Sequence, residues 1–185
     1  MVERRARDPD LLDALDAHEG ISFEGDVWRI VRDERDPLQG YPAGARWDPG
    51  TFDVIYTSLA REGALAEIHF HLTRQPVFPS KIRSVLHRIA IRTRHTLQLA
   101  DIEAVEALGV SRETYSSLSY GRSQEIGDAA AFLGFDGILA PSARWQCQNL
   151  IVFTDRFGPA DLVVAESEPV DWDHWRNTRP RVRSF

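Results

Sequence analysis

The chain has 185 residues, of which 43% are apolar and 27% charged, and its formal net charge is −6. These values are typical of a soluble globular protein of one domain, and the acidic balance excludes a molecule that attracts nucleic acid over its whole surface. No apolar run approaches the roughly 20 residues that span a bilayer, and the N-terminus lacks the apolar core of a secretory signal. Cys147 is the single cysteine, which excludes a disulfide framework. We therefore expect a cytoplasmic protein without a membrane segment.

Short helical and strand-like segments follow one another along the chain. Helices are predicted at 11–18, 60–72, 102–108 and 123–133. Strands are predicted at 26–31, 54–56, 85–91 (with room to continue to Leu99), 136–140, 149–154 and 162–166, and a long loop rich in Pro and Gly at 37–50. Because the strands rarely alternate cleanly with helices, the pattern predicts a single α+β domain over 1–185 and not a doubly wound parallel sheet.

Three chemically useful side chains fall on consecutive predicted elements. Arg46 lies in the Gly/Pro loop, Tyr56 in the next strand, and Glu67 in the following helix, which Ser58 is predicted to cap. An arginine grips phosphate with a bidentate fork, an aromatic ring stacks on a flat heterocycle, and a carboxylate stabilises a nearby cation. Brought together, these groups would hold a phosphorylated sugar and stabilise a positive charge on it.

Glu67 borders the side of its helix that we expect to be buried. Gly63 and Ala64 precede it by four and three residues, so a ligand or a strand can come close to its carboxylate. A neighbouring apolar stripe, formed by Leu65, Ile68 and Leu72, would face the core. The alternative is an ordinary glutamate on a solvated helix face.

Each of the other candidates also has a purely structural alternative. Arg46 either binds a ligand or stacks on an aromatic ring at the surface. Arg29 lies in mid-strand and, if it points inward, requires an anionic partner such as a ligand phosphate or Glu67. Tyr56 either stacks on a heterocycle or fills the core, and Ser142 either binds a ligand or caps the turn in which it lies.

Several common sites are absent from the sequence. There is no Gly-x-Gly-x-x-Gly, no Gly-x-x-x-x-Gly-Lys and no Gly-x-Ser-x-Gly motif, which argues against the two commonest nucleotide-binding loops and a serine nucleophile. His69 and His71 are two positions apart on a helix and point in different directions, so we expect no metal site. Cys147 has no histidine nearby in the sequence, so a catalytic thiol is not expected.

Five short motifs together resemble the RES-domain proteins over about 27–153. They are Trp28-Arg29-Ile30, Gly44-x-Arg46-Trp47-x-Pro49-Gly50, Tyr56-Thr57-Ser58, Ala64-Leu65-Ala66-Glu67, and Pro141-Ser142 followed by Asn149. The resemblance places the arginine, glutamate and serine that give the family its name at Arg46, Glu67 and Ser142, with Arg29 and Tyr56 in the same pocket.

The resemblance implies both a fold and an activity. The fold would be similar to ADP-ribosyltransferases, with mixed or antiparallel sheets and flanking helices. The protein would be the toxin of a bacterial toxin–antitoxin pair and would destroy NAD by hydrolysis or phosphorolysis, with Arg46 and Glu67 catalytic and Arg29, Arg46, Tyr56 and Ser142 binding NAD. NAD is then a substrate, and no cofactor or metal is implied.

The resemblance also implies a protein partner, a helix-turn-helix antitoxin of Xre type, through which alone the toxin would meet DNA. Two other functions stay open. The same pocket would serve an enzyme that transfers ADP-ribose to a protein, and a non-catalytic module would only bind its antitoxin.

The tail at 172–185 lies beyond the matched motifs and shows no helical or strand period. Its notable residues are aromatic and basic, namely Trp172, Trp175, Arg176, Arg179, Arg181 and Arg183. Because such residues are enriched at interfaces, the tail is predicted to contact an antitoxin or a second copy of the chain in a homo-oligomer. The alternative is that both Trp rings pack on the domain's own surface.

Overall fold

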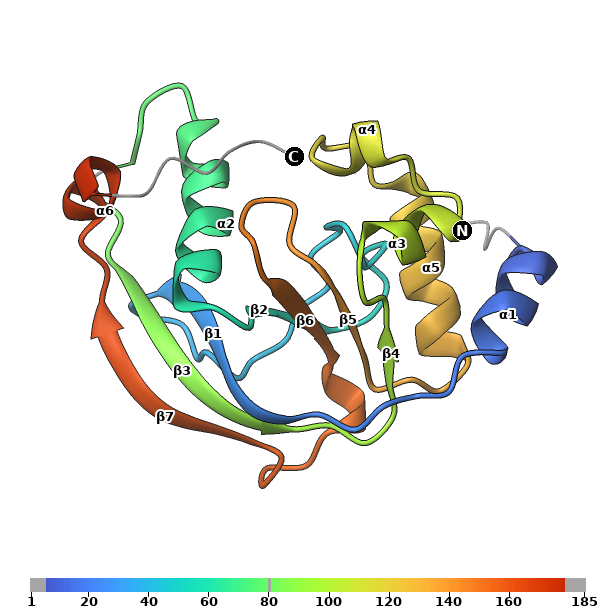
Figure 1. Cartoon of the computed structure of the whole chain (residues 1–185). Helices are drawn as coiled ribbons and strands as arrows, with labels where there is room; N and C mark the ends of the chain where they lie inside the picture. Colours follow the sequence, from blue (N-terminus) through green and yellow to red (C-terminus); the bar gives the residue numbers. More distant parts are fainter. Residues whose placement is uncertain (1–5, 80, 179–185) are drawn as a thin grey trace.

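A seven-stranded sheet with the order β4-β5-β6-β2-β1-β3-β7 forms the centre of the computed structural model, which describes residues 6–79 and 81–178 (Figure 1). The strands are β1 (Glu24–Arg32), β2 (Val54–Ser58), β3 (Ser84–Arg92), β4 (Thr96–Gln98), β5 (Gly137–Pro141), β6 (Gln148–Phe153) and β7 (Leu162–Pro169). The helices are α1 (Pro9–Asp16), α2 (Arg61–Thr73), α3 (Ile102–Ala107), α4 (Arg112–Tyr115), α5 (Gly121–Phe132) and α6 (Trp172–Thr178), with a 3₁₀ turn at Thr154–Arg156. Neighbouring strands pair antiparallel except β4 and β5, so the mixed sheet confirms the α+β prediction.

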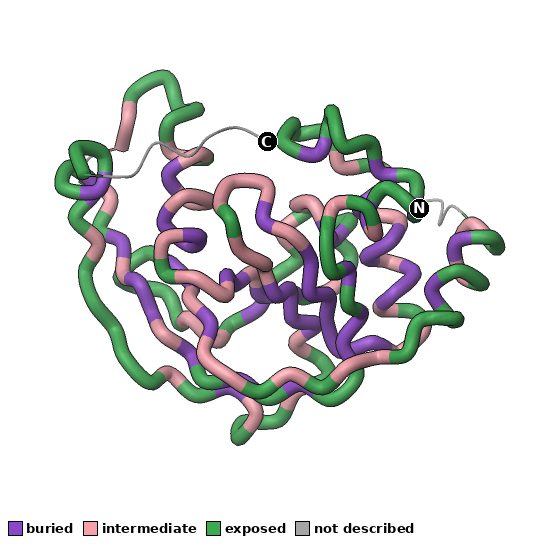
Figure 2. The backbone as a smooth tube through the Cα atoms, in the orientation of Figure 1, coloured by how far each residue is buried: buried purple, intermediate pink, exposed green. Residues whose placement is uncertain are grey.

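The helices form two groups on either side of the sheet's midpoint (Figure 1). One group, α1, α3 and α5, packs on β4, β5 and β6 through a large apolar cluster that includes Leu15, Ile126 and Ile138. The other group, α2 and α6, packs on β1 and β3 around Leu65 and Trp172. Figure 2 shows the buried residues concentrated on the central strands, whereas the outer strand β7 and the surface turns are largely exposed. The space between the two groups is where the candidate site lies.

The sheet is continuous from β1 to β3 but opens between β1 and β2. β1 is in register with β3 from Glu24, opposite Arg92, to Arg32, opposite Ser84. In the described chain, β1 and β2 are in register only where Trp28 faces Ser58. Beyond that pair the two strands diverge. The backbone groups that would otherwise pair in a ladder, and the side chains beside them, are then available to line a cavity.

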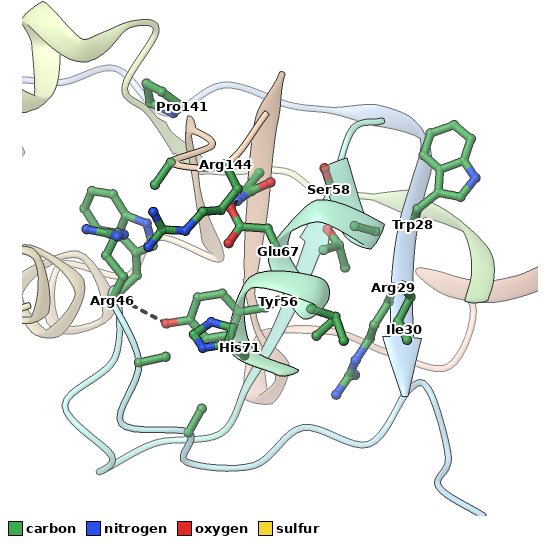
Figure 3. Close-up of a pocket in the computed structure, with 18 of the residues that line it drawn as sticks. Trp28, Arg29, Ile30, Arg46, Tyr56, Ser58, Glu67, His71, Pro141 and Arg144 are labelled. Carbon is green, nitrogen blue, oxygen red and sulfur yellow. Dashed lines mark hydrogen bonds between the residues drawn. The ribbon is translucent and has the colours of Figure 1, made fainter. Parts of the chain in front are cut away.

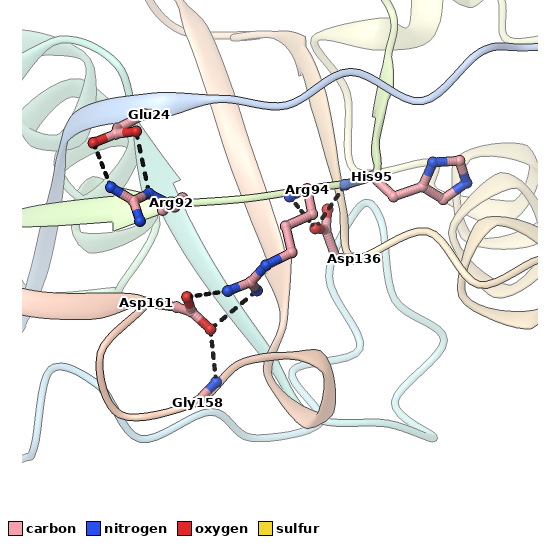
Figure 4. A network of polar contacts seen from close by, with 7 residues as sticks. All are labelled: Glu24, Arg92, Arg94, His95, Asp136, Gly158 and Asp161. Carbon is pink, nitrogen blue, oxygen red and sulfur yellow. Dashed lines mark hydrogen bonds and ion pairs between the residues drawn. The ribbon is translucent and has the colours of Figure 1, made fainter.

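The predicted strand from 85 towards Leu99 is broken into β3 and β4 by a turn that a distant carboxylate holds. Asp136 accepts hydrogen bonds from the backbone N–H groups of Arg94 and His95 at 2.6 and 2.9 Å and from the Thr96 hydroxyl at 2.8 Å (Figure 4). Three donors on one buried carboxylate fix the bend between the two strands firmly. The stretch from Arg92 to Thr96 contains no Gly or Pro and so gave no local sign of this break.

Two local predictions are wrong. The N-cap of α2 is Ala60, not Ser58, which ends β2 and only accepts a long 3.4 Å contact from the Ala60 N–H. The tail does have a helical period, because Trp172 and Trp175, three residues apart on α6, are both buried. The helix α4 was also not predicted.

The tail tryptophans pack on the domain's own core, as the alternative interpretation of the tail held. They contact the cluster that holds Leu65 and Leu86, and the Trp172 indole donates to the Ser84 hydroxyl at 3.3 Å. Arg179, Arg181 and Arg183 lie outside the described residues. Among the helices that the structure describes, none is long and apolar enough to cross a membrane.

Candidate active site

Glu67 reaches from α2 into a cavity and is held there at one carboxylate oxygen. The Ser142 hydroxyl donates to its Oε1 at 2.7 Å and the Asn149 side-chain amide donates to the same atom at 2.9 Å. Its second oxygen, Oε2, has no hydrogen-bond donor among the residues that the structure describes. Glu67 is half-buried and lines the cavity, so the solvated-helix alternative is wrong (Figure 3).

Small residues on α2 let this helix lie close against the strands beside it. A Cβ added at Gly63 would stand 2.3 Å from the Ser58 hydroxyl oxygen and 2.6 Å from the Cys147 sulfur. Neither distance is sterically possible, so the two side chains or the helix itself would have to shift. The spacing of small residues before Glu67 therefore does what the sequence predicted, with strands as the close neighbours.

Ser142 is both a turn cap and a support for Glu67. Its hydroxyl oxygen accepts from the backbone N–H groups of Arg144 and Trp145 at 3.1 and 3.2 Å while it donates to Glu67. The side chain is 5% exposed. The hydroxyl hydrogen is therefore committed to the carboxylate, and Ser142 orients Glu67.

The loop that carries Arg46 is built around the buried carboxylate of Asp48. Asp48 accepts from the backbone N–H groups of Gly44, Ala45 and Gly50 at 2.7, 3.1 and 3.2 Å. Gly44 and Gly50 have φ angles of 61° and 81°, a region that favours glycine. These bonds make the Gly/Pro loop a fixed platform.

Tyr56 completes this platform from β2. Its hydroxyl donates to Asp48 Oδ1 at 2.8 Å and accepts from the Trp47 N–H at 2.8 Å. Burial, reinforced by the Asp48 charge, raises the pKa of Tyr56 well above its usual value. The hydroxyl therefore stays protonated and occupied, and only the ring of Tyr56 is available to the cavity.

Arg46 makes the aromatic contact of its structural interpretation, while its role in binding a ligand stays a prediction. Its guanidinium lies 4.5 Å from the Tyr115 ring centre and 4.8 Å from the Tyr120 ring centre. One nitrogen, Nη2, donates to the Ser117 carbonyl at 3.3 Å, while Nη1 is buried without a hydrogen-bond partner. The aromatic contact is thus present, and Nη1 is left as a buried donor without a partner among the described residues.

Arg29 points inward from β1 and is 7% exposed, but its partners are carbonyl oxygens. Nη1 donates to Pro37 at 2.6 Å, and both terminal nitrogens lie 3.3–3.4 Å from the Gln39 carbonyl. Burial lowers the pKa of its guanidinium. The expectation that an inward Arg29 requires an anionic partner is therefore wrong, because carbonyl dipoles of the 37–50 loop compensate its charge. Figure 3 shows it on the opposite side of the cavity from Arg46.

The cavity has a volume of about 210 Å³ and lies where β1 and β2 separate. It brings together Arg29, Arg46, Tyr56 and Glu67, whereas Ser142 stands behind Glu67. A second cavity of about 650 Å³ adjoins it. The two share the lining residues Arg29, Ile30, Tyr41, Tyr56, Ile68 and His71.

The comparison with protein families decides the classification. The model described as the RES domain matches residues 26–173. The chain belongs to the RES domain family. The predicted resemblance is thereby confirmed, and the matched residues include six strands of the sheet in full and β1 from Asp26 onward.

Named RES relatives are found in Mycobacterium tuberculosis. The chain is 26% identical over 169 residues to NAD(+) phosphorylase MbcT of strain H37Rv, covering 88% of this chain and 91% of that protein. It is 35% identical over 150 residues to probable NAD(+) phosphorylase Rv3189, covering 77% of this chain and 71% of that protein. A crystal structure of the M. tuberculosis MbcT–MbcA toxin–antitoxin complex matches with a TM-score of 0.84 and 25% identity, covering 94% of this chain and 99% of that chain.

Two residues at this RES site were missed as candidates from the sequence. Arg144 lines the cavity two positions after Ser142, and Asn149 supports Glu67 from β6. Asn149 occurs in the motif that carries the family resemblance, which is a signal that could have found it. Arg144 lies in a polar segment without periodicity and gave no such signal.

Neither a metal site nor a reactive thiol emerges at this site. Within residues 6–79 and 81–178, no three His, Cys, Asp or Glu side chains gather as metal ligands. His69 lies between the Phe78 and Trp172 rings, whereas His71 lines the cavity. Burial raises the pKa of the Cys147 thiol, which disfavours the reactive thiolate.

Proposed function

We propose that this chain breaks the nicotinamide–ribose bond of NAD and is the toxin of a toxin–antitoxin pair. The observation that carries the proposal is the Glu67 carboxylate, fixed at one oxygen by Ser142 and Asn149 and available at the other, at the wall of an arginine-lined cavity. The relatives named NAD(+) phosphorylase support NAD as the substrate and phosphate as the attacking group.

The chemistry fits the groups that line the cavity. Nicotinamide leaves with the electron pair of the C–N bond and becomes neutral, so the reaction needs no strong general acid. The ribose acquires oxocarbenium character, as in glycoside cleavage. Glu67 Oε2 would accept a hydrogen bond from a ribose hydroxyl and stabilise the positive charge on the ribose. Because the Glu67 carboxylate is already held in position, little reorganisation is required when the charge develops. A phosphate oxygen then forms the new bond to the same ribose carbon and gives ADP-ribose 1-phosphate.

The other residues would bind and orient the substrate. Arg46 would use its buried, unsatisfied Nη1 on the ribose or a phosphate oxygen, and the Tyr56 ring would stack on nicotinamide. Arg29 would add positive charge from the opposite wall. Ser142 would hold the Glu67 carboxylate in the orientation that the ribose requires.

The partner we propose is an antitoxin, and the family resemblance makes it one of Xre helix-turn-helix type in the cytoplasm. The matched crystal structure contains an MbcT–MbcA toxin–antitoxin complex, which supports an antitoxin as partner. Contact with DNA would then occur only through the antitoxin. Expression of the chain alone should lower cellular NAD and arrest growth, and co-expression of its antitoxin should restore both. Growth arrest at constant NAD would contradict the proposed activity.

The decisive experiment measures nicotinamide release from NAD by the purified protein, with and without inorganic phosphate. The variant Glu67→Gln should lower the rate by about 10²–10³-fold, the loss typical for removal of one preorganised electrostatic group. Glu62→Gln makes the same chemical change on the same helix and is the matched control, because Glu62 does not line the cavity.

Each alternative function gives a different outcome in this experiment. Labelled ADP-ribose that appears on a protein instead of in solution would indicate a transferase. Equal rates for Glu67→Gln and Glu62→Gln would contradict a catalytic role of Glu67. A wild-type protein that binds its antitoxin but releases no nicotinamide would be a non-catalytic module.

A further inference from the structure

Arg144 presents a guanidinium to the cavity without a hydrogen-bond acceptor from the described protein. It lies in the connection between β5 and β6, and its guanidinium carbon stands 3.4 Å from the centre of the Phe70 ring on α2. Its backbone N–H donates to the Ser142 hydroxyl at 3.1 Å, so the main chain is fixed to the residue that supports Glu67. Figure 3 shows its side chain extending past Glu67 towards the side from which Arg46 projects.

The other arginines of the cavity have protein acceptors, and Arg144 does not. Arg29 donates to two loop carbonyls and Arg46 to one, whereas within the described residues no acceptor is recorded for the Arg144 guanidinium. Stacking on Phe70 uses the face of the guanidinium and leaves its N–H edges available. A half-buried cation with unused donors is costly unless an anion approaches it.

The charges around this point favour a phosphate group. Three guanidinium groups, those of Arg29, Arg46 and Arg144, and one carboxylate, that of Glu67, line the same cavity, so the local balance is positive. Burial lowers the pKa of Arg144, and the Glu67 charge opposes this shift. Arg46 adds its buried Nη1, which is also unsatisfied. The planar N–H edges of arginine match phosphate oxygens.

We propose that Arg144, together with the unsatisfied edge of Arg46, forms a phosphate-binding site beside Glu67. This site rests on the proposed function, in which phosphate groups come from two sources: free inorganic phosphate that attacks the ribose, and the diphosphate of NAD. The geometry favours free phosphate, because Arg144 lines the same cavity as Glu67, which in the proposed function would hold the ribose near the carbon that reacts. The diphosphate has another cationic region in the adjoining cavity, where Arg29, Arg32 and Arg35 contribute to the lining.

The test compares Arg144→Gln with Arg74→Gln. Arg74 also stacks on Phe70, at 5.5 Å, but it is exposed and does not line the cavity, so its variant controls for the aromatic contact. Rates are measured against inorganic phosphate at saturating NAD and against NAD at saturating phosphate. The ratio of ADP-ribose 1-phosphate to ADP-ribose is measured by phosphorus NMR.

Arg144→Gln is expected to raise the KM for inorganic phosphate about tenfold to a hundredfold, the range for loss of charge-assisted hydrogen bonds. The product ratio should shift towards ADP-ribose, and Arg144→Lys, which keeps the charge without the fork, should lie between the two. A rise confined to the KM for NAD would support the site with the diphosphate as its occupant. Unchanged values of both KM constants, with the same product ratio as Arg74→Gln, would overturn the proposal.

A binding measurement separates this proposal from the proposed function. Inorganic phosphate is titrated into the wild-type protein and into Arg144→Gln by calorimetry, without NAD. Weaker phosphate binding by the variant supports the site even if the protein releases no nicotinamide, an outcome that would defeat the proposed activity alone. Equal phosphate affinities would overturn the site whatever the activity.

Discussion

Removal of the Tyr56 hydroxyl should destabilise the protein, because it takes one hydrogen bond from Asp48 and one from Trp47. In Tyr56→Phe the Asp48 carboxylate loses one of four donors and keeps the backbone N–H groups of Gly44, Ala45 and Gly50. The Trp47 N–H loses its acceptor while Trp47 stays 2% exposed.

The size of the effect follows from these two losses. A hydrogen bond to a charged group contributes about 1.5–3 kcal/mol, and an unsatisfied buried donor costs about 1–3 kcal/mol. Because the remaining donors on Asp48 offset part of the first loss, we expect Tyr56→Phe to lower the free energy of unfolding by about 3 kcal/mol. For a chain of this size that corresponds to a fall in Tm of roughly 6–12 °C.

Urea unfolding followed by tryptophan fluorescence measures this change, with Tyr41→Phe as the matched control. Tyr41 is 47% exposed, and no hydrogen bond of its hydroxyl is recorded within the described chain. The control should therefore change the free energy of unfolding by less than about 0.5 kcal/mol. Equal, small effects of the two substitutions would refute the argument that the Tyr56 hydroxyl fixes the Arg46 loop.

Two further substitutions test how that loop is held and used. Gly127→Ala on α5 would place a Cβ 1.8 Å from the Trp47 carbonyl oxygen, so it should lower the free energy of unfolding by about 3 kcal/mol or more. In the control, Gly121→Ala, the added Cβ meets nothing within 4 Å, so thermal unfolding should show a neutral or slightly stabilising effect. Equal Tm values for the two variants would contradict the close approach of α5 to Trp47. Arg46→Lys keeps the charge but loses the planar fork and the stack between two tyrosine rings. The kcat/KM for NAD should therefore fall about tenfold or more. Near-wild-type turnover would exclude a direct role of Arg46 in binding the ligand.

Local patterns in the sequence were sufficient for most elements and for three of the site residues. Apolar periodicity and turn residues placed α2, α5 and the long strands, because those signals arise within one element. Arg46, Tyr56 and Glu67 follow one another along the chain, and the structure places all three at one cavity. Their catalytic and binding roles stay predictions, as does the similarity to ADP-ribosyltransferases.

Contacts between residues far apart in the sequence account for what was missed. The break between β3 and β4 depends on Asp136, about 40 residues away, and nothing near the turn indicates it. The same holds for Arg29. The sequence indicated that a buried guanidinium would need a compensating partner, and the structure shows that the carbonyl oxygens of Pro37 and Gln39 accept its hydrogen bonds. Sequence reasoning identified the need for compensation and could not identify its source.

The opening between β1 and β2 explains why these residues form a site at all. Had the two strands stayed paired beyond Trp28 and Ser58, the following residues of β1 would be joined to β2 by a ladder and no cavity would separate them. Two features hold the opening. The Arg29 guanidinium is bonded to the 37–50 loop, and the same loop is fastened to β2 by the Tyr56 hydroxyl on Asp48. The loop therefore connects the two strands where their ladder is missing, and Arg29 and Tyr56, which make these bonds, also line the cavity.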